Sequence, residues 1–175
     1  MVIRFQICGE RMFAGAVGTQ SLKVFDLAIA RTGLNMRDAR YTGFDLLAAD
    51  LEANDHKAYY PGAVPLRVQV TGDRRSGRLL GGQILGNRRA EISKRIDIIA
   101  TALFQDASVE YLNDLDLSYT PPFSSPWDPV QMAAQAWCAN LRHLTESTRD
   151  TDRREPDVTQ KNLFDRARVT DQLES

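Results

Sequence analysis

The middle of the chain alternates between apolar and polar residues, a pattern that predicts β-strands. In "PLRVQVTGDRRSGRLLGGQILG", residues 65–86, Leu66, Val68 and Val70 alternate with polar neighbours. A turn rich in Gly, Asp and Ser follows and the alternation then resumes, so the segment predicts a β-hairpin. The earlier stretch "SLKVFDLAIARTGL", residues 21–34, alternates in part and predicts a strand or a pair of strands.

Two segments between these strands are less regular. Residues 35–43, "NMRDARYTG", place Asn35 at a helix N-cap and Gly43 at a helix stop, which predicts a short connecting helix. Residues 44–55, "FDLLAADLEAND", fit the period of a helix or of a strand. Their shortness and the closing Asn-Asp pair favour a strand.

The second half of the chain changes to helical spacing. Residues 88–105 predict an amphipathic helix with apolar positions at Ile92, Ile96, Ile99, Ala100 and Leu103. Its charged positions are expected to face mostly elsewhere; they are Arg89, Glu91, Lys94, Arg95 and Asp97. Residues 108–115 predict a shorter helix that begins with Ser108. Asp128 and Pro129 predict the N-cap and first residue of a last helix, whose apolar stripe is Val130, Ala133, Trp137, Leu141 and Leu144.

The connector before the last helix is rich in proline. Residues 115–130, "LDLSYTPPFSSPWDPV", combine four prolines with the aromatic residues Tyr119, Phe123 and Trp127. Proline has a fixed φ and no amide proton, so this run is neither a helix interior nor a central strand. We expect a rigid connector that fixes the direction in which Tyr119 and the last helix leave the sheet.

Strands in the first half and helices in the second predict an α+β fold of two layers, with an antiparallel β-sheet and helices packed on one face. The 175 residues, 43% hydrophobic and 26% charged, fit one domain with its own core. After Leu144 the sequence is charged and poor in large apolar residues. Residues 145–175 are therefore predicted to form a polar tail, disordered or marginally helical.

Charge and cysteine content narrow the function classes. The formal net charge is −1, and basic residues are interspersed with acidic ones, which argues against nucleic acid and membrane partners. No apolar run has the length of a signal peptide or a membrane span, so we expect a cytoplasmic protein. In that reducing compartment, Cys8 and Cys138 are expected to be thiols rather than a structural disulfide.

Motifs of self-sufficient catalysis are missing from the sequence. The segments "AGAVG" and "GRLLGGQILG" lack the spacing of a phosphate-binding loop, and Gly81 and Gly82 fit better where another part of the chain approaches the sheet closely. His56 and His143 have no metal-ligand spacing, so no metal is predicted. Cys138, beside Trp137 on a helix, is expected to pack as a small apolar residue.

Tyrosines at turns are the remaining candidates for chemistry. Tyr59 and Tyr60 precede Pro61-Gly62, a turn dipeptide, and Tyr119 opens the proline connector. A tyrosine on a turn can pack its ring and still direct its hydroxyl outward as a hydrogen-bond donor. From the residues alone, these rings either cover the core or form a binding corner.

Five segments in one order connect the chain to a known family. They are "GTQSLKVFDLAIARTGL", "HKAYYPGAVPLRV", "GRLLGGQILG", "KRIDIIATAL" and "LDLSYTPPFSSPWDPVQMA". Together, over residues 13–137, they resemble the C-terminal dimerisation domain of the FAD-dependent pyridine nucleotide-disulfide oxidoreductases. The branch of coenzyme A-disulfide reductase, NADH oxidase and NADH peroxidase is the most similar. The resemblance implies a remnant of the end of an FAD domain at 1–12, a dimerisation domain at 13–144, and the tail.

This resemblance implies a site that two subunits share. Full-length members carry FAD and NAD(P)H domains and a redox cysteine ahead of this domain; none of their motifs is found here, so no cofactor is expected in this chain. By position, Tyr59 and Tyr119 would be catalytic, reaching across a two-fold interface towards the partner's redox cysteine. His56 is predicted to bind substrate together with these two tyrosines.

Two functions remain open from the sequence. The first is an interface domain that contributes to cell redox homeostasis, either as a homodimer or beside a flavoprotein half that carries the FAD and NAD(P)H domains. The second is a repurposed module that binds a small thiol, a nucleotide or a protein partner. The absence of cofactor motifs makes the chain by itself an improbable flavin enzyme under either hypothesis.

Overall fold

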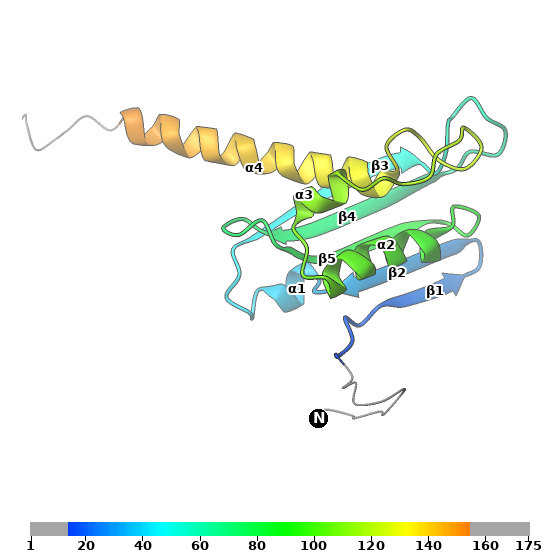
Figure 1. The fold of residues 1–175 in the computed structure, drawn as a ribbon, viewed down its shortest axis with the longest axis horizontal. Coiled ribbons are helices and arrows are strands. Elements are labelled where there is room, and N and C mark those ends of the chain that lie inside the picture. The colour runs from blue at the N-terminus through cyan, green and yellow to red at the C-terminus, as the bar shows by residue number, and fades with distance from the viewer. Residues whose placement is uncertain (1–13, 155–175) are drawn as a thin grey trace, which may run out of the picture. The chain divides into compact units, whose positions relative to one another are not determined.

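The computed structural model describes residues 14–154, which are built around a five-stranded antiparallel β-sheet (Figure 1). The sheet has the strand order β1-β2-β5-β4-β3, and every neighbouring pair is antiparallel. The strands are β1 Gln20–Val24, β2 Leu27–Gly33, β3 Leu46–Asn54, β4 Pro65–Asp73 and β5 Leu79–Asn87. The predicted strand pair, the ambiguous segment read as a strand and the hairpin are all confirmed.

Four helices of the described residues lie where helices were predicted, although α2 begins four residues later than its predicted segment. They are α1 Met36–Ala39, α2 Ile92–Phe104, α3 Val109–Asn113 and α4 Pro129–Arg154. The Asn35 side chain caps α1 and the Ser108 side chain caps α3, as the sequence predicted. Residues of α2, α3 and the first turns of α4 pack together on one face of the sheet (Figure 1). The α+β class with helices on one face is thus confirmed.

Helix α4 is longer than its apolar stripe. It continues to Arg154, so residues 145–154, the start of the predicted polar tail, are helical. The chain divides into two compact units between Leu141 and Arg142. The predicted remnant at 1–12 and the rest of the tail, from residue 155, lie outside the described residues.

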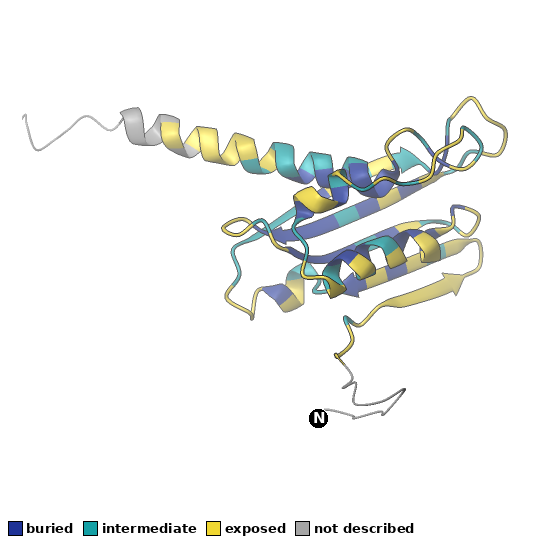
Figure 2. Cartoon of the chain, in the orientation of Figure 1, coloured by how far each residue is buried: buried dark blue, intermediate teal, exposed yellow. Residues whose placement is uncertain are grey.

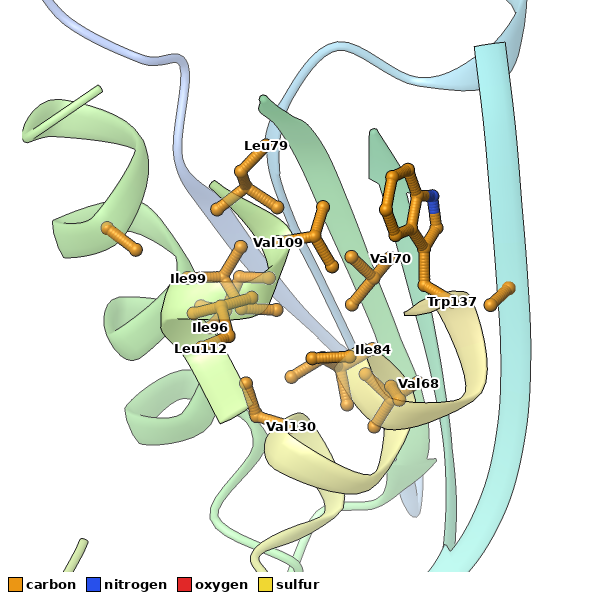
Figure 3. Close-up of a cluster of buried hydrophobic side chains, with 14 of the residues drawn as sticks. Val68, Val70, Leu79, Ile84, Ile96, Ile99, Val109, Leu112, Val130 and Trp137 are labelled. Carbon is orange, nitrogen blue, oxygen red and sulfur yellow. The ribbon is translucent and has the colours of Figure 1, made fainter. Parts of the chain in front are cut away.

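The core lies between the sheet and the helices (Figure 3). Alternate residues of the central strands, among them Val68, Val70 and Ile84, are fully buried. They belong to the same cluster as Ile96 of α2 and Trp137 of α4. The apolar faces that the sequence predicted for the strands and for the helices therefore pack into one shared core.

The opposite face of the sheet carries exposed apolar side chains towards β1, a strand that is exposed along its whole length (Figure 2). By strand register, Leu22, Ile29 and Leu85 form one row across β1, β2 and β5, and Val24 faces Leu27 beside it. All five side chains are exposed. This face is polar on β4 and β3, where Arg67 and Gln69 bond to Asp50 across the strands, an arrangement that contributes little to stability because it is exposed.

The turn between β4 and β5 is organised by Asp73. Its carboxylate accepts hydrogen bonds from the Ser76 hydroxyl at 2.5 Å and from the Asp45 amide at 2.9 Å. The Ser76 hydrogen bond is the largest cause that holds the pKa of Asp73 below its usual range; burial opposes it. The aspartate thus fixes the end of the sheet opposite to the β3–β4 loop.

The predicted close approach at Gly81 and Gly82 is confirmed. A Cβ on Gly81 would lie 2.1 Å from the carbonyl oxygen of Leu34. A Cβ on Gly82 would lie 2.8 Å from Cδ1 of Ile99, the far end of a flexible side chain. Glycine at 81 therefore leaves room for the backbone of Leu34, whereas glycine at 82 leaves room for the side chain of Ile99 in α2.

This difference predicts unequal costs for two neighbouring substitutions. We expect Gly81→Ala to lower the free energy of unfolding by about 3 kcal/mol, because backbone must move, and Gly82→Ala by about 1 kcal/mol, because Ile99 can change rotamer. Urea denaturation of both variants measures the difference. Equal losses would contradict the close backbone approach at Gly81.

Candidate functional site

Two loops far apart in the sequence lie side by side at one end of the sheet (Figure 1). One joins β3 to β4 and carries Tyr59; the other is the proline connector between α3 and α4 and carries Tyr119. The backbone amide of Lys57 donates a hydrogen bond to the carbonyl oxygen of Pro121 at 3.3 Å. The structure therefore brings together the two loops whose tyrosines the sequence singled out.

Both tyrosines are exposed on these loops. Tyr59 is 73% exposed and Tyr119 is 41% exposed. The Tyr59 ring stands against that of Tyr60 with centroids 6.3 Å apart and ring planes at 60°, and Gly62 with φ 90° turns the chain behind them. Of the two alternatives that the residues left open, this exposure argues against rings that cover the core, while the binding and catalytic roles of the tyrosines stay predictions.

His56 occupies a different environment from the tyrosines. It is buried, and its Nδ1 lies 3.0 Å from Oδ1 of Asp55. The same carboxylate oxygen accepts the backbone amides of His56 at 3.0 Å and Val64 at 2.9 Å. Nε2 of His56 is buried and has no hydrogen-bond partner among the described residues. The imidazole thus lies beneath the loop that carries Tyr59, and substrate binding by His56 stays a prediction.

Arg95 of α2 lies under both loops. Its guanidinium donates from Nε to Oδ2 of Asp128 at 3.1 Å and from Nη2 to the carbonyl oxygen of Asp55 at 2.6 Å. Nη1 donates to the carbonyl oxygen of Ala90. The Ser124 hydroxyl lies 3.1 Å from Asp128 Oδ2. The same carboxylate oxygen therefore bonds to Ser124 of the connector and to Arg95 of α2.

The prediction that Arg95 faces away from the core was wrong. Arg95 is only 6% exposed, because it lies three residues after Ile92 and four before Ile99 and so shares their side of α2. Its charge made it look like a surface residue in the sequence. Its position within the apolar stripe was the signal that could have revealed it.

Asp128 has the capping role that the sequence predicted. Its Oδ1 accepts the backbone amide of Val130 at 3.0 Å, and its own amide donates to Oε1 of Gln131 at 3.0 Å. The carboxylate therefore starts α4 with one oxygen and binds Arg95 with the other. This double use anchors the end of the proline connector.

The glycines of the "GRLLGGQILG" segment do not form a dinucleotide cradle. Gly81, Gly82 and Gly86 lie inside β5, and the space beside each of them is filled by backbone or side chains. A phosphate-binding loop instead lies between a strand and the N-terminus of a helix. At these three glycines, therefore, no open backbone is available to a phosphate group, and no step through FAD or a nicotinamide nucleotide is assigned to the described residues.

Cys138, as expected, packs half-buried against the core. Across residues 14–154, no group of three His, Cys, Asp or Glu side chains is arranged to hold a metal ion. Within that same range, no helix combines the length and the apolar character needed to cross a bilayer.

A sheet covered by helices on one face, with two hydrogen-bonded loops that expose aromatic side chains at one end, defines the class of this α+β domain. The family model of the pyridine nucleotide-disulphide oxidoreductase dimerisation domain matches residues 19–129. The chain belongs to this family.

Relatives of known function carry this domain as part of a longer chain. An NAD(P)H sulfur oxidoreductase (CoA-dependent) of Pyrococcus furiosus is 37% identical over 130 residues, which are 74% of this chain and 29% of the relative. A coenzyme A disulfide reductase of Staphylococcus haemolyticus is 31% identical over 75% of this chain and 29% of its own. The chain thus spans less than a third of the length of these relatives.

Solved structures agree in fold. Reduced CoADR-RHD of Bacillus anthracis matches with a TM-score of 0.72 at 37% identity, over 77% of this chain and 24% of that chain. An NAD-dependent persulfide reductase of A. fulgidus matches with a TM-score of 0.72 at 34% identity, over 78% of this chain and 25% of that chain. The sheet and helices described above are therefore those of a dimerisation domain.

Proposed function

We propose that this chain forms a two-fold homodimer and supplies Tyr59 and Tyr119 to a thiol or disulfide site on the partner subunit. The observation that carries the proposal is the pairing of the two loops: the Lys57–Pro121 hydrogen bond joins them, and both tyrosines remain exposed. The exposed apolar rows on β1, β2 and β5 support an interface as well, because contiguous exposed apolar residues mark interaction surfaces.

The proposed chemistry is that of a phenol beside sulfur. A tyrosine hydroxyl is a hydrogen-bond donor, so it can orient a bound thiolate or sulfenate, or give a proton to the thiolate that leaves when a disulfide is cleaved. The electrons for that cleavage would come from flavin and nicotinamide groups outside this chain. The chain alone is therefore proposed to be inactive. Where the flavin and nicotinamide domains are not part of the same polypeptide, the proposed partner is a cytoplasmic flavoprotein that carries those groups.

A chimaera tests the roles of the tyrosines. Residues 13–144 would replace the corresponding domain of the Staphylococcus haemolyticus coenzyme A disulfide reductase, and kcat for CoA disulfide would be measured. We expect Tyr59→Phe and Tyr119→Phe each to lower kcat about a hundredfold, the usual contribution of a positioned proton donor. Tyr41→Phe, in the loop after α1, is the matched control and should leave kcat unchanged.

The alternative function gives a different result in the same chimaera. If both phenylalanine variants retain full kcat, the catalytic role of the tyrosines is contradicted. Isothermal titration of the chain with CoA and CoA disulfide then addresses the second hypothesis, a module that binds a thiol without redox chemistry. Heat with either compound that disappears in the Tyr59→Phe variant would favour that module.

A further inference from the structure

The two tyrosine loops are joined below the surface as well as at it. The direct surface link is one backbone hydrogen bond, from the Lys57 amide to the Pro121 carbonyl oxygen, and its length of 3.3 Å is at the long end for such a bond. A single long bond leaves two loops free to separate. The buried side chains beneath them make the additional connection.

Arg95 provides that connection through one rigid group. Its Nη2 donates to the Asp55 carbonyl oxygen, four residues before Tyr59, and its Nε donates to the Asp128 carboxylate, which also bonds to Ser124 of the connector. A guanidinium is planar, and its donors have fixed relative directions. The positions of its two acceptors, one on each side, are therefore fixed relative to each other.

Burial of the Arg95–Asp128 pair makes movement of either loop unfavourable. Arg95 and Asp128 are both more than nine-tenths buried, and a buried charge without its partner is strongly unfavourable. A loop that moved away would leave the guanidinium or the carboxylate unpaired in the interior. The contact of Arg95 with each loop therefore depends on the other loop remaining in place.

We propose that Arg95 is a positioning residue that couples the Tyr59 loop to the Tyr119 loop, so that the two hydroxyls are presented to a partner in one fixed relation. The coupling itself is a property of this chain. Its consequence for thiol chemistry rests on the proposed function above.

Amide hydrogen exchange on the full chain tests the coupling. The Lys57 amide reports the contact between the loops, and the Tyr60 amide, bonded to the Lys57 carbonyl oxygen at 2.8 Å, reports order inside one loop. Asp128→Asn keeps a good N-cap for α4 but loses the charge that faces Arg95. We expect exchange at the Lys57 amide to become about tenfold faster and exchange at the Tyr60 amide to change less than twofold. None of the hydrogen bonds of Asp128 reaches the Tyr59 loop, so the effect at Lys57 would have to pass through Arg95.

Three further variants separate coupling from mere stabilisation. Arg95→Lys keeps the charge but not the fork, so it should speed exchange at Lys57 as much as Asp128→Asn does, and the double variant should be no faster than either single one. Ile99→Val changes a buried core residue of the same helix and should lower the melting temperature. It should leave the ratio of the Lys57 and Tyr60 exchange rates unchanged.

A tyrosine signal provides a second measure. In chain labelled with 3-fluorotyrosine, the fluorine resonances of Tyr59 and Tyr119 should both shift in Asp128→Asn, while that of Tyr41 should not. If Lys57 exchange and both resonances remain as in the parent while the melting temperature falls as in Ile99→Val, Arg95 is a buried stabilising residue only and the proposal is overturned. Coupling found here together with full activity of the phenylalanine chimaeras would instead overturn only the proposed function.

Discussion

Replacing Trp137 by alanine is expected to lower the free energy of unfolding by about 4 kcal/mol. The indole is 1% exposed, and its N–H donates a hydrogen bond to the carbonyl oxygen of Leu47 at 2.8 Å. Gly72 of β4 lies so close that a Cβ there would be 2.7 Å from the indole ring. The alanine variant would therefore leave a cavity between α4 and the sheet and lose the hydrogen bond from the indole to Leu47. Urea denaturation measures the loss.

The second tryptophan of the chain is the matched control. Trp127, in the proline connector, is 58% exposed, and an exposed substitution usually changes stability by less than about 0.5 kcal/mol. Trp127→Ala should therefore unfold at nearly the urea concentration of the parent. Similar losses for both variants would contradict the packing of α4 on the sheet.

Replacing Arg95 by methionine is expected to lower the free energy of unfolding by about 3 to 5 kcal/mol. Methionine has a similar length and no charge, so the Asp128 carboxylate would remain buried without its cation. The carbonyl oxygens of Asp55 and Ala90 would also lose their donors. Thermal and urea denaturation both measure this loss.

Two variants identify the cause of that loss. Arg67→Met removes an arginine whose ion pair with Asp50 is exposed on the open face of the sheet, and it should cost less than about 1 kcal/mol. Combining Arg95→Met with Asp128→Asn removes both buried charges and should recover part of the stability lost in Arg95→Met alone. A double variant that is no more stable than Arg95→Met alone would contradict an uncompensated charge as the cause.

Local patterns in the sequence were sufficient for most of the fold. The alternation around Val68 predicted β4 and β5, and the caps at Asn35, Ser108 and Asp128 predicted where three helices begin. These features depend on neighbours a few residues apart, which a single sequence displays directly. The order of the strands depends on pairing between distant segments, and no local pattern determines it.

The candidate site shows the same limit. That Tyr59 and Tyr119 stand on loops follows from the neighbouring prolines and glycine, and their proposed roles come from resemblance to a family. That their loops lie side by side follows only from the fold, through the Lys57–Pro121 hydrogen bond. Arg95 was misassigned because charge usually indicates a surface position, whereas here distant Asp128 offsets the cost of burying that charge.

The extension of α4 has a similar physical origin. Past Leu144 the sequence lacks the large apolar residues that would mark a packed face, and so it was interpreted as a tail. Once a helix has begun, each added residue gains one backbone hydrogen bond without a new nucleation cost. The helix can therefore continue through charged residues to Arg154. Composition predicts packing better than it predicts where a helix ends.

Sedimentation velocity of the purified full chain, over a concentration range from below one micromolar upwards, tests the central proposal most directly. An interface domain that acts through a two-fold contact should sediment as a species of twice the 19.6 kDa chain mass and dissociate on dilution. A folded protein that sediments as a 19.6 kDa monomer at every concentration would contradict the proposed homodimer.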